Sequence, residues 1–263
     1  MSIQRYGSEG LIYVQNGPSF TCSGMGTCKD NNIIIAPEIN GYPVERIAND
    51  AFSSISISLK SVHMPDSIIS IGESAFKNAN ILDIKFSKEL RIIERDAFAY
   101  NNFTTIDLSN TALTILGIGA FAFCEYLQSL YLPDTLIDIM HDLVTNKSNS
   151  VQHIEIVNPN SDSEYYTSDN SIIHRNTKTL IVGNNEGTIP KGVKIIGNRA
   201  FRYKLFDSII IPNSVDAIAP TGTSGTDYFA FLACDNLKNV YIAKGENTIT
   251  GVECFNDNVQ LWY

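Results

Sequence analysis

The dipeptide Ala-Phe recurs along this chain of 263 residues at nearly constant spacing. Its phenylalanine stands at Phe52, Phe76, Phe98, Phe121, Phe201 and Phe231, and a Cys-Phe copy adds Phe255. Successive phenylalanines are 24, 22, 23, 80, 30 and 24 residues apart. A short period with two longer interruptions is typical of a solenoid, in which one small unit stacks on the next. Because each unit covers the apolar edge of its neighbour, we expect one elongated domain without a central catalytic cleft.

A second recurrent segment lies between successive Ala-Phe pairs, and its apolar and polar residues alternate. Copies occupy residues 59–65, 82–87, 105–109, 127–133, 151–156, 208–212 and 237–242. Alternation with period two predicts a short half-buried strand. Proline follows several copies, as at Pro65 and Pro133, and ends a strand because it has no N–H for the ladder. After each Ala-Phe pair we expect a single helical turn, as in residues 120–127.

Stacking of these strands aligns their side chains into columns on two faces. The inward columns are apolar and include Val62, Ile106 and Leu130. One outward column comprises His63, Lys85, Asp107, Tyr131, Glu155, Ile210 and Tyr241, and the neighbouring column includes His153. The two tyrosines offer rigid amphipathic surfaces that suit sugars or protein partners. Two interpretations are open, a solvated sheet face or a ligand-binding surface formed by His63, Lys85, Asp107, Tyr131, Glu155 and Tyr241.

The repeated unit reads Ile-Gly-x-x-Ala-Phe-x-x-Cys-x-x-Leu-x-x-Val-x-Leu-Pro. Residues 72–76, 124–133 and 234–237 carry it most clearly, and residues 24–44 match the usual opening. Over roughly residues 10 to 261 the chain resembles the BspA-like class of leucine-rich repeats. The resemblance implies a repeat solenoid, a leucine-rich-repeat-like right-handed coil of short β-strands with single helical turns. It also implies attachment, since such repeats resemble those of bacterial and protist surface proteins and of some phage tail-associated proteins.

The chain is expected to form one continuous domain in two parts. Residues 1–46 would form an N-terminal capping hairpin and the first coil, and residues 47–263 the solenoid proper. The longer interruptions predict a hairpin insertion at 158–190 and a loop insertion at 219–228. The chain ends in a half-apolar strand with its only tryptophan, Trp262, beside Tyr263. That strand either folds back on the last coil or forms an interface with another subunit or a particle.

Composition excludes several classes of partner. The formal net charge of −9 argues against nucleic acid and anionic membranes, which require clustered Lys and Arg. No run of about 18 apolar residues indicates a transmembrane helix, so we expect no membrane insertion. No apolar segment follows Met1 as in a signal peptide. A cell-surface, extracellular or virion location is expected, and a cytoplasmic one is an alternative.

The cysteines and histidines form no recognisable metal or catalytic motif, so no cofactor is expected. The five cysteines include no CxxC pair. Cys22 and Cys28 are either bridged or free, whereas Cys124, Cys234 and Cys254 are expected to be buried thiols. The four histidines are scattered. The carboxylates of Asp107 and Glu155 fall two coils apart, near the separation in glycosidases, but an open sheet face would not desolvate either.

These observations favour a non-enzymatic recognition or adhesion module on a cell or virion surface. It would bind a protein or glycan receptor through the outward columns and the insertions. An intracellular protein–protein scaffold is the alternative, and a glycan-active enzyme is a distant one. Homo-oligomerisation or particle docking would use the C-terminal strand.

Overall fold

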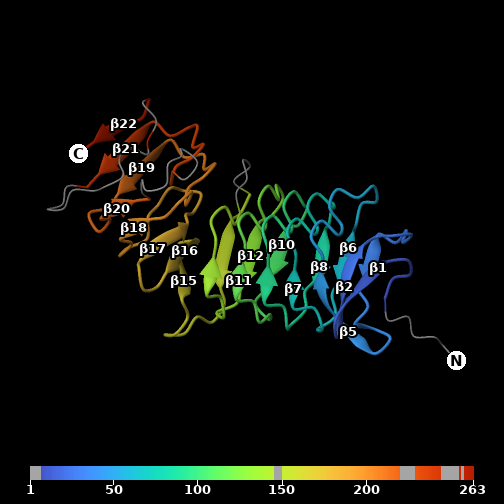
Figure 1. The fold of residues 1–263 in the computed structure, drawn as a ribbon. Helices are drawn as coiled ribbons and strands as arrows, with labels where there is room; N and C mark the ends of the chain where they lie inside the picture. The colour runs from blue at the N-terminus through green and yellow to red at the C-terminus, as the bar shows by residue number, and fades with distance from the viewer. Residues whose placement is uncertain (1–6, 145–149, 220–228, 244–254, 256–257) are drawn as a thin grey trace.

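The chain winds into an elongated solenoid with its two ends far apart (Figure 1). The computed structural model describes residues 7–144, 150–219, 229–243, 255 and 258–263. In these residues the chain forms short strands, β1 to β22, and no helix. The predicted repeat solenoid is confirmed. None of the described residues lies in a helix long and apolar enough to span a bilayer.

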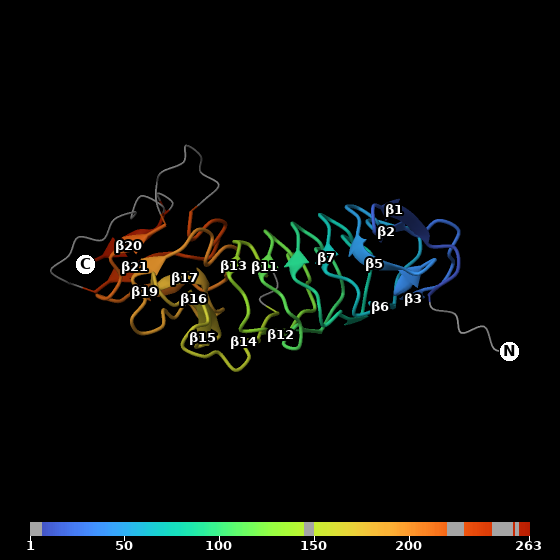
Figure 2. The same cartoon turned by 60° about the horizontal axis from the view of Figure 1, so that its bottom comes forward.

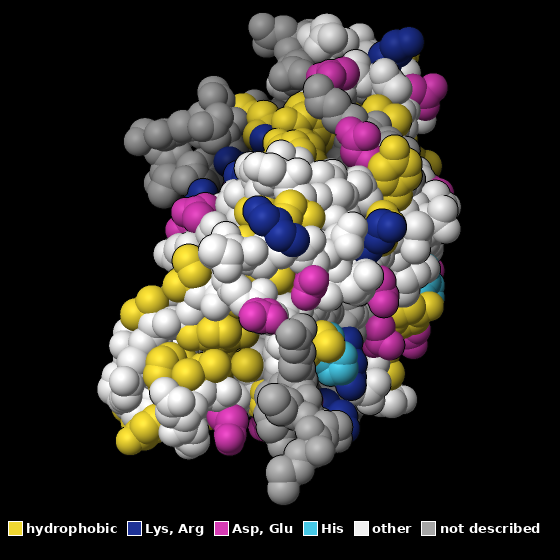
Figure 3. All heavy atoms as spheres, turned by 90° about the vertical axis from the view of Figure 1, so that its right-hand side faces the viewer, with side chains coloured by type: hydrophobic (Ala, Val, Ile, Leu, Met, Phe, Trp, Pro, Cys, Tyr) yellow, Lys and Arg dark blue, Asp and Glu magenta, His cyan; other side chains and the backbone are white. Residues whose placement is uncertain are grey.

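One long sheet runs along the first half of the solenoid. In spatial order it contains β1 (Ile12–Asn16), β2 (Ser19–Gly24), β5 (Tyr42–Ile47), β7 (Ser70–Ile71), β9 (Ile92–Ile93), β11 (Ile115–Leu116) and β13 (Asp138–Ile139), with β4 (Glu38–Ile39) paired to β5. Strands from β2 to β13 pair in parallel, and β1 and β2 form an antiparallel hairpin at the N-terminal end. Figure 3 looks onto this end and shows hydrophobic side chains gathered at its lower left. On β1, Ile12 and Val14 are exposed.

Three short parallel sheets form the opposite side of the coils. They contain β3 (Asn32–Ile34), β6 (Ser61–His63) and β8 (Asp83–Lys85); β10 (Thr105–Asp107), β12 (Ser129–Leu132) and β14 (His153–Ile156); and β19 (Ser208–Ile211), β21 (Asn239–Ile242) and β22 (Gln260–Trp262). Residues of the predicted inward columns are buried on these strands, except for Ile84, which is half-buried. We call the outward-facing rows of the same strands the outer ladder.

The Ala-Phe segments form tight turns, so the prediction of single helical turns is wrong. Around Ala120 and Phe121, both Gly119 and Phe123 adopt left-handed conformations, with φ of 65° and 58°. A right-handed helical turn cannot contain such residues. The same two positions are left-handed around other copies of the pair. Some backbone N–H groups of these turns bond three residues back, as from Ala122 N to Gly119 O at 2.9 Å, and others bond to the next coil, as from Phe98 N to Ala120 O at 2.9 Å.

The phenylalanines of the repeat stack into a ladder inside the solenoid. Ring centroids are 4.9, 5.3 and 5.6 Å apart along Phe52, Phe76, Phe98 and Phe121. The ladder resumes with Phe201, Phe231 and Phe255 at 5.2 and 4.9 Å. Between the two stacks, the backbone of Gly183 pairs with Ala200 in the same way, but a Cβ there would collide with the Phe201 ring. The ladder is therefore interrupted between Phe121 and Phe201.

Another sheet, of five strands, begins at this interruption. It contains β15 (Tyr165–Ser168), β16 (Ser171–His174), β17 (Thr179–Val182), β18 (Ile195–Ile196) and β20 (Ala217–Ile218), of which the first three are antiparallel. The predicted hairpin turns here, with Lys178 N bonded to His174 O at 3.0 Å. The buried residues separate into two hydrophobic clusters that meet at these strands. We call this region the junction, and Figure 2 shows it between the two stacks of coils.

Polar contacts join segments on the two sides of the junction. Ile139 N donates a hydrogen bond of 3.1 Å to the hydroxyl of Tyr165, which thereby terminates the edge of β13. The Asn185 amide donates to the carbonyl of Val151 at 2.6 Å. The predicted boundaries at 46 and 158–190 stay predictions, and residues 220–228 of the loop insertion lie outside the described residues.

Candidate functional site

The predicted ligand-binding residues lie on the outer ladder in three separate groups. In the first group, parallel register places His63 of β6 directly beside Lys85 of β8. Both side chains are exposed. The first and second groups lie on the N-terminal side of the junction, and the third group lies on its C-terminal side (Figure 1).

The second group forms a compact polar cluster. Register aligns Asp107 of β10 with Tyr131 of β12, and Tyr131 with Glu155 of β14. His153 joins them, with its ring centroid 5.3 Å from the Tyr131 ring and its Nε2 3.1 Å from Glu155 Oε2. We call Asp107, Tyr131, His153 and Glu155 the ladder patch. The sequence indicated His153 only as a member of a neighbouring column.

Local hydrogen bonds hold the ladder patch in place. The Asp107 carboxylate accepts bonds from the backbone N–H of Ser109 at 2.9 Å and from its hydroxyl at 2.6 Å. This turn fixes the carboxylate at the end of β10, as short polar side chains commonly do. The patch thus presents two carboxylates, an imidazole and a phenol on a rigid strand platform.

The third group lies on β21 and β22, where aromatic side chains dominate. Register places Tyr241 beside Trp262, with ring centroids 6.1 Å apart and an angle of 15° between the ring planes. Trp262 Nε1 donates a hydrogen bond of 3.1 Å to Asn239 Oδ1. Trp262 and Tyr263 are 50% and 70% exposed. Their role as an interface stays a prediction.

Comparison with known proteins identifies the repeat. The model of the BspA type leucine-rich repeat region matches six copies over residues 45–173 and 183–262, which is more than half of the chain. The chain belongs to the BspA-type leucine-rich-repeat family. No curated protein matches it in sequence.

Solved structures share the fold of this BspA-type chain. A leucine-rich repeat protein from Bacteroides ovatus is 17% identical, with a TM-score of 0.56 over 97% of this chain and 75% of that one. The pneumococcal vaccine antigen PcpA is 16% identical, with a TM-score of 0.53 over 97% and 69%. The Treponema pallidum protein TpLRR is 17% identical, with a TM-score of 0.51 over 88% and 79%. At these identities the likeness shows the fold alone.

The two acids of the ladder patch in this BspA-type solenoid are not direct neighbours in the register. Tyr131 lies between Asp107 and Glu155 in the register, and Asp107 is exposed. The carboxylates therefore face solvent across an aromatic ring and do not flank an enclosed substrate cleft. In the same residues, no three His, Cys, Asp or Glu side chains gather to hold a metal ion.

The described cysteines form no disulfide and pack in the core. Cys22 and Cys28, whose pairing the sequence left open, are both buried and unbridged. Burial raises the pKa of Cys22 to about 12, and it does the same for Cys124 and Cys234. Cys124 Sγ donates to the carbonyl of Phe98 at 3.3 Å. Cys254 lies outside the described residues.

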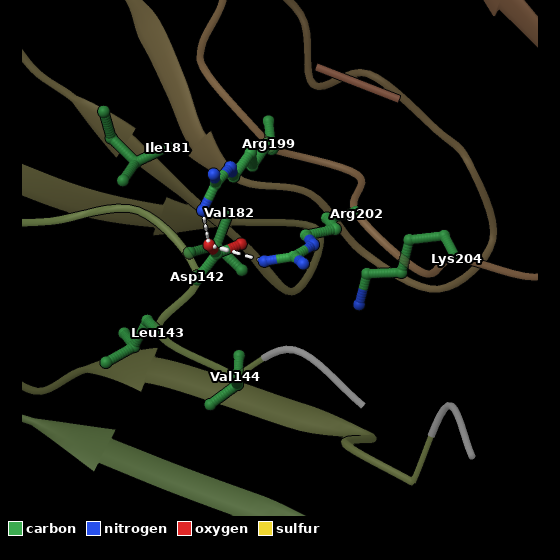
Figure 4. Close-up of a pocket in the computed structure, with 9 residues that line it drawn as sticks. Asp142, Leu143, Val144, Ile181, Val182, Arg199, Arg202 and Lys204 are labelled. Carbon is green, nitrogen blue, oxygen red and sulfur yellow. Dashed lines mark hydrogen bonds and ion pairs between the residues drawn. The ribbon is translucent and has the colours of Figure 1, made fainter. Parts of the chain in front are cut away.

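A buried charge cluster lies at the junction, and no sequence pattern indicates it. Asp142 Oδ2 accepts a hydrogen bond from Arg199 and another from Arg202 at 2.8 Å (Figure 4). His141 Nδ1 lies 3.3 Å from the same oxygen. Asp142 belongs to the coil that ends the first half, and both arginines belong to the second half. These ion pairs therefore connect the two parts of the solenoid that contain the separate hydrophobic clusters.

Burial and charge act in opposite directions on Asp142. Burial favours the neutral acid and so acts to raise its pKa. The hydrogen bonds from His141 and Arg199, with the charge of Arg202, outweigh burial and hold the pKa of Asp142 below its ordinary value. The carboxylate is consequently ionised at neutral pH, and its ion pairs link the coil of Asp142 to the coil of Arg199 and Arg202.

Proposed function

We propose that this chain is a non-enzymatic recognition or adhesion module, displayed on a cell or virion surface, that binds a protein or glycan receptor. Membership of the BspA-type family supports this function. Stacked strands give a rigid array on which side chains keep fixed spacing. Binding residues held on such a scaffold lose little entropy when a partner docks.

The observation that carries the proposal is the register of the ladder patch. Three neighbouring strands place an acid, an aromatic ring and a second acid in one row. His153 contacts both Tyr131 and Glu155, which orients the ring and the carboxylate. A rigid tyrosine flanked by hydrogen-bond acceptors suits a polar macromolecular surface, because its ring supplies contact area and its neighbours supply direction.

The test compares two variants on arrays of purified extracellular proteins and of glycans. The patch variant carries Asp107→Asn, Tyr131→Ala and Glu155→Gln, which keep the turn at Ser109 while removing two charges and the ring. The control carries Glu45→Gln on β5 and Glu73→Gln just after β7, which remove the same charge from the side of the long sheet. We expect the patch variant to lose at least tenfold in affinity, roughly 1.4 kcal/mol, for the array member that the native chain binds.

Both variants must keep the far-ultraviolet circular dichroism and the melting temperature of the native chain. A folded patch variant that binds as tightly as the control would remove the ladder patch from the proposal. A native chain that binds no member of either array would contradict the recognition function itself.

A further inference from the structure

A groove of about 430 Å³ lies beside the third group of the outer ladder. Its floor is the outer face of β19 and β21, and its wall is the loop that joins β17 to β18. The lining residues are Glu186, Gly187, Thr188, Ile189, Ser208, Ile209, Ile210, Pro212 and Tyr241. Figures 1 and 2 place these strands at the C-terminal end, beyond the junction. The volume falls within the range of ligand-binding pockets.

The wall of the groove is held rigid from beneath. The buried side chain of Asn184 donates to the carbonyl and hydroxyl oxygens of Thr188 at 3.2 and 2.6 Å, and its own Oδ1 accepts from Thr188 N at 3.0 Å. Gly187 has a φ of +69° and lies so close to the Phe206 ring that a Cβ would overlap it. The loop is therefore pre-formed, and a ligand would not have to order it.

The floor exposes a row of apolar side chains. Register aligns Ile210 with Tyr241, and Tyr241 with Trp262. These side chains are 65%, 44% and 50% exposed. The corresponding row on β10, β12 and β14 is the polar ladder patch. Contiguous exposed apolar side chains, unlike singly scattered ones, mark interaction surfaces or ligand-binding grooves.

One charged residue lines the groove. The carboxylate of Glu186 is exposed, and among the described residues the charged group that interacts with it is the ammonium of the buried Lys204. A cationic group entering the groove would therefore meet an exposed carboxylate in a chain whose net charge is already −9. Thr188 and Ser208 add hydroxyls, so the lining has few groups to match the many hydroxyls of a glycan.

We propose that this groove binds an extended peptide segment of a partner protein, with apolar side chains next to a lysine or arginine. Alternate residues of an extended peptide point to the same side. Two apolar anchors at positions i and i+2 would cover Ile210 and Tyr241, and the basic residue would reach Glu186. The inference rests on the proposed recognition function and deepens it by naming the chemistry of one partner.

The test is selection of peptides from a displayed library of random heptapeptides on the full chain. Peptides that also bind the double variant Tyr241→Ala, Glu186→Gln are removed in each round. We expect the enriched peptides to carry two apolar residues at i and i+2 with an adjacent lysine or arginine. Measured by fluorescence anisotropy, Glu186→Gln should weaken the best peptide about tenfold, and Ile210→Ser should weaken it further.

Three results would overturn the groove proposal. In the first, the native chain enriches no peptides that the double variant fails to bind. In the second, the enriched peptides carry no basic residue. In the third, Ile210→Ser folds and binds the best peptide as tightly as the native chain. A mass in light scattering that doubles with concentration and returns to the monomer in Ile210→Ser would assign the groove to a second copy of this chain instead.

The two proposals fail separately. The patch variant should bind the selected peptide as the native chain does, and Ile210→Ser should leave the array partner of the ladder patch bound. Loss of array binding with intact peptide selection would remove the ladder patch and keep the groove.

Discussion

Replacing Asp142 with asparagine should uncouple the two halves of the solenoid. The Asp142 side chain is 5% exposed, and those of Arg199 and Arg202 are 15% and 21% exposed. Asparagine keeps an acceptor but removes the carboxylate charge that faces two largely buried guanidinium groups. Breaking a buried ion pair by removing one partner typically costs 3–5 kcal/mol, and we expect about 3 kcal/mol because the arginines reach some solvent.

Two probes distinguish uncoupling from general destabilisation. The only tryptophan, Trp262, lies in the second half, so its fluorescence follows that half alone during denaturation by urea. Far-ultraviolet circular dichroism follows the strands of both halves. For Asp142→Asn we expect the two midpoints to separate, whereas in the native chain they should lie closer together.

The pH dependence of this effect has a fixed sign. Because the folded-state pKa of Asp142 lies below its ordinary 3.8, the carboxylate stabilises the fold at all pH values above about 4. That stabilisation is lost as the pH falls through the folded-state pKa. The difference in stability between the native chain and Asp142→Asn should therefore narrow below pH 4.

Matched variants complete this test. Asp216→Asn breaks an exposed pair with Lys194, whose side chains are 45% and 48% exposed, and should cost less than about 1 kcal/mol. Replacing Asp142, Arg199 and Arg202 together by leucine and two methionines should be far less harmful than Asp142→Asn alone. A loss of under 1 kcal/mol for Asp142→Asn, with coincident midpoints, would refute the coupling role.

Three further predictions concern the core. Phe98→Ala should lower the free energy of unfolding by about 3–5 kcal/mol in urea denaturation, because the Phe98 ring stacks on Phe76 and Phe121. A loss below about 2 kcal/mol would show that the phenylalanine stack contributes little to stability. Burial lowers the pKa of Lys204 from 10.5 to about 8. The free energy of unfolding of the native chain should therefore rise by about 3 kcal/mol between pH 8 and 10.5, relative to that of Lys204→Met. A difference between the two chains that stays constant over this pH range would contradict the lowered pKa. Gly183→Ala should cost roughly 1–3 kcal/mol through overlap with Phe201, and Phe201→Leu should reduce that cost in the double variant.

Repetition made the columns of the solenoid predictable from the sequence. Val62, Ile106 and Leu130 fall at equivalent points of successive units, and the structure buries all three. Tyr131 and Glu155 were expected side by side for the same reason, and the parallel register aligns them. A periodic signal is averaged over many copies, so a single poor copy does not hide it.

Features that occur once were not predictable. Asp142 lies in the degenerate repeat, and its partner Arg199 follows 57 residues later, so no local pattern links them. The groove likewise depends on how the loop at Glu186 folds over β19. The prediction of helical turns was wrong because Phe123 adopts a left-handed conformation. Bulky residues rarely adopt this conformation, so the residue type does not indicate it.

The interrupted phenylalanine ladder has a mechanical consequence. A pull along the long axis is shared by backbone hydrogen bonds and stacked rings from Phe52 to Phe121, and again from Phe201 to Phe255. Between Phe121 and Phe201 the stack is missing, and the load passes through side-chain contacts such as the Asp142 ion pairs. Under tension the solenoid should open at the junction first, and its length should then increase in a single step. Both halves, with the ladder patch on one and the groove on the other, would then remain folded at the two ends of a short tether.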